Sequence, residues 1–102
     1  MKIYANKRFG TLQLKLVGEL DEHSAKNARR EADEYADNFI GGKKAVLDLS
    51  EVSFMDSTGI GFLIGRYKKF HRLGIPLYIS SPSQNTDKIL LMSGVYTLIP
   101  KI

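Results

Sequence analysis

Phe54-Met55-Asp56-Ser57-Thr58-Gly59-Ile60-Gly61 joins two apolar segments of different periodicity, and this junction sets the class of fold. The continuous run Ala45-Val46-Leu47-Asp48-Leu49 precedes it and is typical of a buried strand. After it, apolar residues recur at steps of three and four from Ile60 to Leu73, which predicts a helix. Asp56, Ser57 and Thr58 should therefore lie where a strand ends and a helix begins.

In an open α/β sheet, this edge is where ligands and partners usually bind. Free main-chain N–H groups in the first helical turn favour a carboxylate or a phosphate there. Simple N-capping by Asp56 and Ser57 is the alternative explanation. Three features favour a functional site: three capping residues where one helix end needs fewer, two large apolar residues beside a polar turn, and the position at this edge of the sheet.

The rest of the chain alternates between strand and helix patterns. The expected elements are strands at 3–7 and 12–17, a helix over 25–39, the strand at 45–49, the helix at 60–73, a strand at 77–79, a short helix after Ser83 and a last strand at 96–99. This order predicts right-handed βαβ crossovers and a mixed, mostly parallel sheet in one α/β domain spanning 1–102.

Residue types refine the two longer helices. Asp21 is placed to cap the first, whose inner face of alanines allows close approach to a sheet, and Gly41-Gly42 should end it. In the second, the expected inward-facing residues are Ile60, Leu63, Ile64, Tyr67 and either Phe70 or His71. Phe62 falls off this apolar stripe, so we expect it to be an exposed aromatic residue.

Composition limits the function classes. The chain has 102 residues, 43% hydrophobic and 25% charged, which suits one domain with one core. No apolar run approaches the roughly 20 residues that span a bilayer, and the start lacks a signal-peptide core. Cysteine is absent, so disulfides and thiolate metal sites are impossible. We expect a cytoplasmic protein without a membrane partner.

The net charge of +4 raises the question of nucleic acid. Acidic residues offset the first basic cluster on the same segment, and no aromatic residues interleave to form a stacking platform. Solvated helix faces explain the pattern better than a nucleic-acid site. The basic face from Arg66 to Arg72 could instead meet an acidic protein partner.

An enzyme is a weaker interpretation of Ser57. Met55 stands where a nucleophile elbow, G-x-S-x-G, needs glycine. Neither His23 nor His71 is placed beside Ser57 by its spacing. The glycines after Ser57 match no phosphate-cradling loop, and two histidines without clustered carboxylates make no metal site. No cofactor is expected.

The segment Asp48 to Gly61 strongly resembles the phosphorylation-site motif of the anti-sigma factor antagonists, the bacterial STAS domains. The resemblance extends to Gly18-Glu19-Leu20-Asp21, Gly65-Arg66-Tyr67-Lys68 and Met92-Ser93-Gly94. It looks closest to the sporulation branch, which acts on the anti-sigma-F factor. The alternative is a partner-switching module of another pathway, such as general stress control.

The resemblance implies that Ser57 is the phosphoacceptor and Asp56 its supporting acid. It also implies an anti-sigma factor with serine kinase activity as partner, a PP2C-type phosphatase, and only an indirect effect on the sigma factor. Asp21 would contact a basic group on the kinase. The expected partner-binding residues are Asp21, Phe54, Met55, Asp56, Thr58 and Gly59, flanked by Phe62 and Arg66.

Three departures from the family bear on these expectations. Relatives usually carry another helix after the last strand, so apolar surface near Ile99 and Ile102 should be exposed. Thr58 stands where a second serine often occurs, so the acceptor could shift by one residue. The segment from Ser83 to Thr86 is more polar than is usual in relatives, which bears on where the short helix begins.

Overall fold

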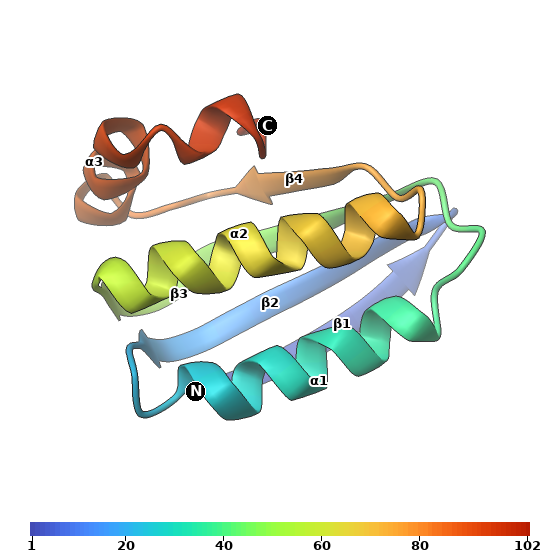
Figure 1. Cartoon of the computed structure of the whole chain (residues 1–102), viewed down its shortest axis with the longest axis horizontal. Coiled ribbons are helices and arrows are strands. Elements are labelled where there is room, and N and C mark those ends of the chain that lie inside the picture. Colours follow the sequence, from blue (N-terminus) through green and yellow to red (C-terminus); the bar gives the residue numbers. More distant parts are fainter.

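The four strands of residues 1–102 form one sheet in the order β1-β2-β3-β4 in the computed structural model (Figure 1). β1 (Lys2–Arg8) runs antiparallel to β2 (Thr11–Leu20). β3 (Lys44–Met55) lies parallel to both β2 and β4 (Leu77–Ser80). The predicted mixed, mostly parallel sheet is confirmed.

Two helices cover one face of the sheet. α1 (Ala25–Asp37) and α2 (Ser57–Arg72) lie side by side in front of the strands in Figure 1. α3 (Gln84–Ser93) and the 3₁₀ helix η1 (Val95–Thr97) lie beyond the β4 edge. Both α1 and α2 begin at the edge where β2 and β3 end, so this edge gathers two helix N-termini.

The core lies between the sheet and these helices. Leu12, Leu14 and Leu16 alternate along β2 and are fully buried, as the period of two in a strand requires. Small side chains on α1, Ala28 and Ala32 among them, let that helix approach the sheet closely. On α2, Leu63 and Phe70 are fully buried, whereas His71 is exposed.

The strand register brings the loop after β2 beside the start of α2. Leu20, the last residue of β2, pairs with Met55, the last residue of β3. The pairing shifts register between Lys15 and Val17 and again after Gly18, whose φ of 114° strains any other residue. Asp21 therefore follows a strand end that is adjacent to the Asp56–Ser57 turn.

The predicted last strand is wrong. After a left-handed turn at Gly94 the chain forms the 3₁₀ helix η1, and residues 98–99, which follow it, form no strand either. Only Lys101 makes an isolated bridge to Ile79. Because this turn folds the segment back, Ile99 is fully buried, against expectation, while Ile102 is 60% exposed, as expected.

The start and the end of α1 differ from the prediction, whereas the start of α3 agrees with it. Asp21 does not cap α1, because Ser24 occupies that position. α1 ends at Asp37, before Gly41-Gly42. α3 begins as predicted, since the Ser83 side chain accepts a hydrogen bond from the Thr86 N–H. Of α1, α2 and α3, not one meets both the length and the hydropathy that a membrane span requires.

Candidate functional site

Asp56 is the N-cap of α2. It has extended backbone geometry, and its Oδ1 accepts the N–H of Thr58 at 2.9 Å and that of Gly59 at 3.4 Å. One carboxylate thus satisfies two of the N–H groups that a helix start leaves unpaired. The local sequence explains this arrangement, because Asp is among the preferred N-cap residues.

Ser57 is the first residue of α2 and lies on the surface. Its hydroxyl makes no hydrogen bond within the chain, since the capping bonds of this turn all go to Asp56. Capping therefore explains Asp56 and does not explain Ser57. Thr58 is partly buried, which leaves Ser57 as the more accessible hydroxyl of the pair.

Gly59 is a packing position rather than a surface position. A Cβ at this residue would clash with the Met55 side chain and lie 3.2 Å from the Leu20 carbonyl oxygen. The first turn of α2 therefore sits directly on the ends of β2 and β3. The expectation that Gly59 contributes contact surface is wrong, because this close approach buries it.

Phe54 and Met55 point to opposite sides of the end of β3. Phe54 is 50% exposed, whereas Met55 is 4% exposed and belongs to the core. Successive residues of a strand alternate between its faces, so only one of this pair can face a partner. Phe54 remains a surface candidate, and the prediction for Met55 is wrong.

Asp21 organises the loop beside this turn. Its Oδ1 accepts the N–H of His23 at 3.0 Å and that of Ser24 at 3.1 Å, and the Ser24 hydroxyl donates to the Glu19 carbonyl at 2.8 Å. The hydrogen bond from the Ser24 N–H lowers the pKa of Asp21, and the bond from His23 adds to the shift. Asp21 thus presents a fixed carboxylate at the edge that carries Ser57.

Phe62 and Arg66 are buried, in contrast to the predicted exposed flank. They are 5% and 4% exposed, and the guanidinium carbon lies 5.0 Å from the ring centroid. Arg66 Nε lies 2.8 Å from Asp33 Oδ1 on α1. Burial lowers the pKa of Arg66, and the charge of Asp33 opposes that shift. α2 packs against both the sheet and α1, so it buries a wider arc than its apolar stripe indicates.

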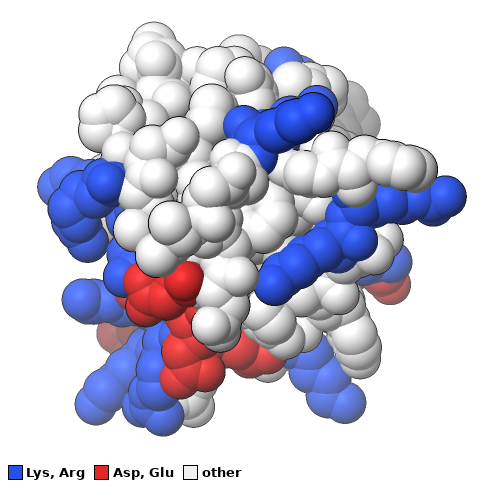
Figure 2. Space-filling model, turned by 90° about the vertical axis from the view of Figure 1, so that its right-hand side faces the viewer, with Lys and Arg blue, Asp and Glu red and all other residues white.

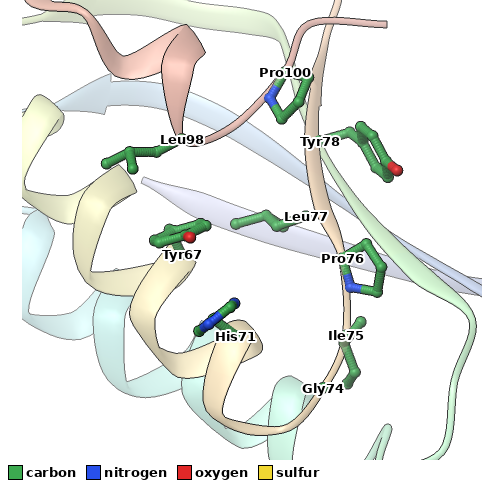
Figure 3. A pocket seen from close by; sticks show the side chains of 9 residues that line it. All are labelled: Tyr67, His71, Gly74, Ile75, Pro76, Leu77, Tyr78, Leu98 and Pro100. Carbon is green, nitrogen blue, oxygen red and sulfur yellow. The ribbon is translucent and has the colours of Figure 1, made fainter.

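Neither His23 nor His71 interacts with Ser57. No hydrogen bond joins either one to the serine, and His71 lies fourteen residues along α2, about 21 Å at 1.5 Å per residue. His71 stacks on Tyr67, with ring centroids 5.4 Å apart. Tyr67 and His71 line a cavity of about 410 Å³ between the end of α2, β4 and the C-terminal segment (Figure 3).

Charge at the end of the molecule opposite Ser57 is mixed. Figure 2 views this end and shows acidic side chains gathered in one area with basic side chains around it. No group of three or more His, Cys, Asp or Glu side chains is placed to hold a metal ion.

Comparison with known proteins identifies the family. The STAS domain model matches residues 2–102. An anti-sigma F factor antagonist of Paenibacillus polymyxa is 34% identical over 91 residues, covering 89% of this chain and 77% of that protein. An anti-sigma-B factor antagonist of Bacillus subtilis (strain 168) is 28% identical over 88 residues, covering 86% and 78%.

Solved structures match the fold. The unphosphorylated form of the anti-sigma factor antagonist SpoIIAA superposes with a TM-score of 0.78 at 22% identity, covering 99% of this chain and 88% of that one. The phosphorylated form of SpoIIAA from Bacillus gives a TM-score of 0.71 at the same identity, covering 99% and 91%. Together with the family match, these similarities show that the chain belongs to the STAS domain family, whose curated members most similar to it include antagonists of anti-sigma factors.

Proposed function

We propose that this chain is a non-catalytic anti-sigma factor antagonist controlled by phosphorylation of Ser57. In its unphosphorylated form it binds an anti-sigma factor that is also a serine kinase, and so releases the sigma factor. That kinase phosphorylates Ser57 and the complex separates. A PP2C-type phosphatase restores the binding form.

The observation that supports this proposal most is the free hydroxyl of Ser57. It lies on the surface, one residue after a cap that Asp56 already completes. A kinase can therefore modify it without breaking a hydrogen bond of the fold. The half-exposed Phe54 and the fixed carboxylate of Asp21 supply apolar and acidic contacts at the same edge.

The charge change is large enough to act as a switch at the interface. A phosphate adds about −1.5 to −2 charge, and a helix N-terminus tolerates that charge within the domain. A partner surface seated on Ser57 would instead meet repulsion, steric bulk and the desolvation of a dianion. Losing about 4 kcal/mol there would weaken binding roughly a thousandfold.

A second candidate is the same switch in a different pathway. The similarity to an anti-sigma-B factor antagonist favours a general stress system as the alternative. Ser57 would keep its role, and only the cognate kinase would change.

Phosphate transfer tests the proposal. The protein is incubated with anti-sigma factor kinases of both classes and ATP, and the modified residue is located by mass spectrometry. We expect one phosphate on Ser57, none on Ser57→Ala, and unchanged incorporation by Ser83→Ala. Ser83 is the matched control, because it is also exposed at a helix start but its hydroxyl is hydrogen-bonded.

A Thr58→Val variant separates the two adjacent hydroxyls. Transfer that persists in Thr58→Val and disappears in Ser57→Ala assigns the acceptor to Ser57. Phosphate found on Thr58 or elsewhere would contradict the assignment. Absence of transfer from every kinase of both classes would contradict the proposed function.

A further inference from the structure

A basic groove runs between α1 and α2, starting beside the phosphoacceptor. It encloses about 520 Å³, and Thr58 lines one end of it. Its basic lining residues are Lys26 and Arg29 on α1 and Arg66, Lys68, Lys69 and Arg72 on α2. Asp33 is the only acidic residue in the lining. The groove therefore carries a strong excess of positive charge along one face of the molecule.

Most of that charge is not neutralised within the chain. Arg66 pairs with Asp33, and Lys69 Nζ lies 2.7 Å from Asp37 Oδ1. The other four, Lys26, Arg29, Lys68 and Arg72, form no ion pair. Four unpaired cations beside one another repel, so a negatively charged occupant would relieve the repulsion.

The floor of the groove is open and fixed in shape. A Cβ added to Gly61 or Gly65, one turn apart on α2, would meet no atom within 4 Å. Phe62 and Arg66 are held between the two helices, so the groove needs no rearrangement to accept a ligand. From Thr58 to Arg72 the groove follows fourteen residues of helix, about 21 Å.

The arrangement suits an extended anion better than a single phosphate group. The unpaired lining charges lie on both helices, Lys26 and Arg29 on α1 and Lys68 and Arg72 on α2, rather than around one point. At the helix N-terminus, where a phosphate would be held by main-chain N–H groups, Asp56 already takes those of Thr58 and Gly59. A protein segment with several carboxylates would match the spread of charge.

We propose that the groove between α1 and α2 binds an acidic segment of the partner protein that recognises Ser57. This inference rests on the proposed function and gives the interface two parts. The Ser57 edge carries the phosphorylation switch, and the groove supplies long-range attraction that speeds association. Attraction of this kind weakens as salt screens it, whereas the switch depends on close contact.

Binding to the kinase partner at two salt concentrations separates the two parts. The groove variant Arg29→Gln/Lys68→Gln/Arg72→Gln removes three exposed, unpaired charges. The control Arg8→Gln/Lys43→Gln/Lys44→Gln removes three exposed charges that do not line the groove. We expect the groove variant to bind at least about tenfold more weakly at about 0.05 M salt, with the difference shrinking at about 0.5 M. The control should bind within about twofold of the unaltered protein.

A groove variant that folds and binds like the unaltered protein at low salt would overturn the inference and leave the proposed function intact. If the unaltered protein binds no anti-sigma kinase at all, the proposed function fails. The groove is then tested directly with a fluorescent, Glu-rich helical peptide of about 14 residues, which matches the groove in length. Binding that disappears in the groove variant supports the site. No binding, or displacement of the peptide by micromolar ATP, contradicts it.

Discussion

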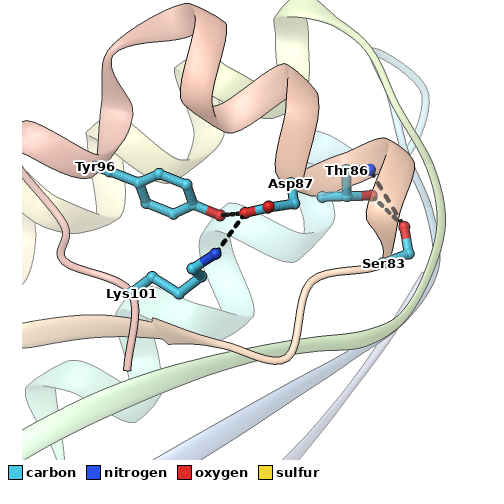
Figure 4. Close-up of polar contacts among 5 residues, drawn as sticks. All are labelled: Ser83, Thr86, Asp87, Tyr96 and Lys101. Carbon is cyan, nitrogen blue, oxygen red and sulfur yellow. Dashed lines mark hydrogen bonds and ion pairs between the residues drawn. The ribbon is translucent and has the colours of Figure 1, made fainter.

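Two helices of this chain begin beside an exposed serine, and only one of these serines has a free hydroxyl. At α3, Ser83 is itself the cap: its Oγ accepts the Thr86 N–H at 3.2 Å and lies 3.0 Å from Thr86 Oγ1 (Figure 4). At α2, Asp56 is the cap and Ser57 follows it. A shift of one position relative to the cap thus separates a serine whose hydroxyl caps a helix from one whose hydroxyl is free.

The two helix starts also differ in charge. The first turn of α3 contains Asp87. Its Oδ1 accepts hydrogen bonds from the Tyr96 hydroxyl at 2.6 Å and from Lys101 Nζ at 3.0 Å (Figure 4). The first turn of α2 contains no acidic residue. A phosphate added at α2 therefore meets the favourable end of the helix dipole, where the only adjacent carboxylate is that of the cap, Asp56. At α3 it would face Asp87.

The largest expected effect on stability comes from the packing of the first turn of α2 against the ends of β2 and β3. Gly59→Ala should destabilise the fold by about 1 to 3 kcal/mol, because the added Cβ clashes with Met55. The matched variant Gly61→Ala has open space around its Cβ and should stabilise the helix by about 0.5 to 1 kcal/mol. Urea unfolding of both variants measures the difference. Equal stabilities would show that the start of α2 is not held against the strand ends.

Removal of the α2 cap should have the next largest effect. Asp56→Ala leaves the N–H groups of Thr58 and Gly59 without their side-chain acceptor, so we expect a loss of about 1 to 2 kcal/mol. Asp56→Ser should restore much of that stability, since serine also caps helices. Thermal unfolding followed by circular dichroism tests both. A neutral Asp56→Ala substitution would remove the structural distinction between Asp56 and Ser57.

The two serines themselves give a direct comparison. Ser83→Ala should cost about 1 kcal/mol, because it removes the cap of α3. Ser57→Ala should change stability by less than about 0.5 kcal/mol, because its hydroxyl has no partner in the fold. The free energies of unfolding are compared in the same buffer. Equal losses would mean that Ser57 is a capping residue after all.

The smallest expected effect is a pH dependence at α3. The hydrogen bond from the Tyr96 hydroxyl lowers the pKa of Asp87 most, and the hydrogen bond from Lys101 lowers it further. The ionised form is therefore favoured in the folded state, and its stabilisation is present above the ordinary carboxyl range near about pH 4. It is lost as the pH falls through the lowered pKa. Tyr96→Phe should reduce stability at neutral pH and flatten the loss in acid, as thermal unfolding between about pH 2.5 and 7 can show. If the stability of Tyr96→Phe fell as steeply with decreasing pH as that of the unaltered protein, this role of the hydroxyl would be contradicted.

Local patterns predicted the mixed, mostly parallel sheet, the helices and the position of Ser57, because periodicity and turn residues act over a few positions. They failed where distant segments meet. Phe62 and Arg66 are buried because α1 presents alanines and Asp33, which lies 33 residues from Arg66. Residues 96–99 resemble a strand locally, but the chain turns at the left-handed Gly94, and the first two of these residues lie in η1.

The most direct test of the account compares the partner affinity of the phosphorylated and unphosphorylated protein, with the melting temperature of each. Calorimetric titration with the kinase partner should give a Kd about a thousandfold larger after phosphorylation of Ser57, equivalent to about 4 kcal/mol, while the melting temperature changes little. A phosphorylated protein that remains folded and binds as tightly as before would contradict the account.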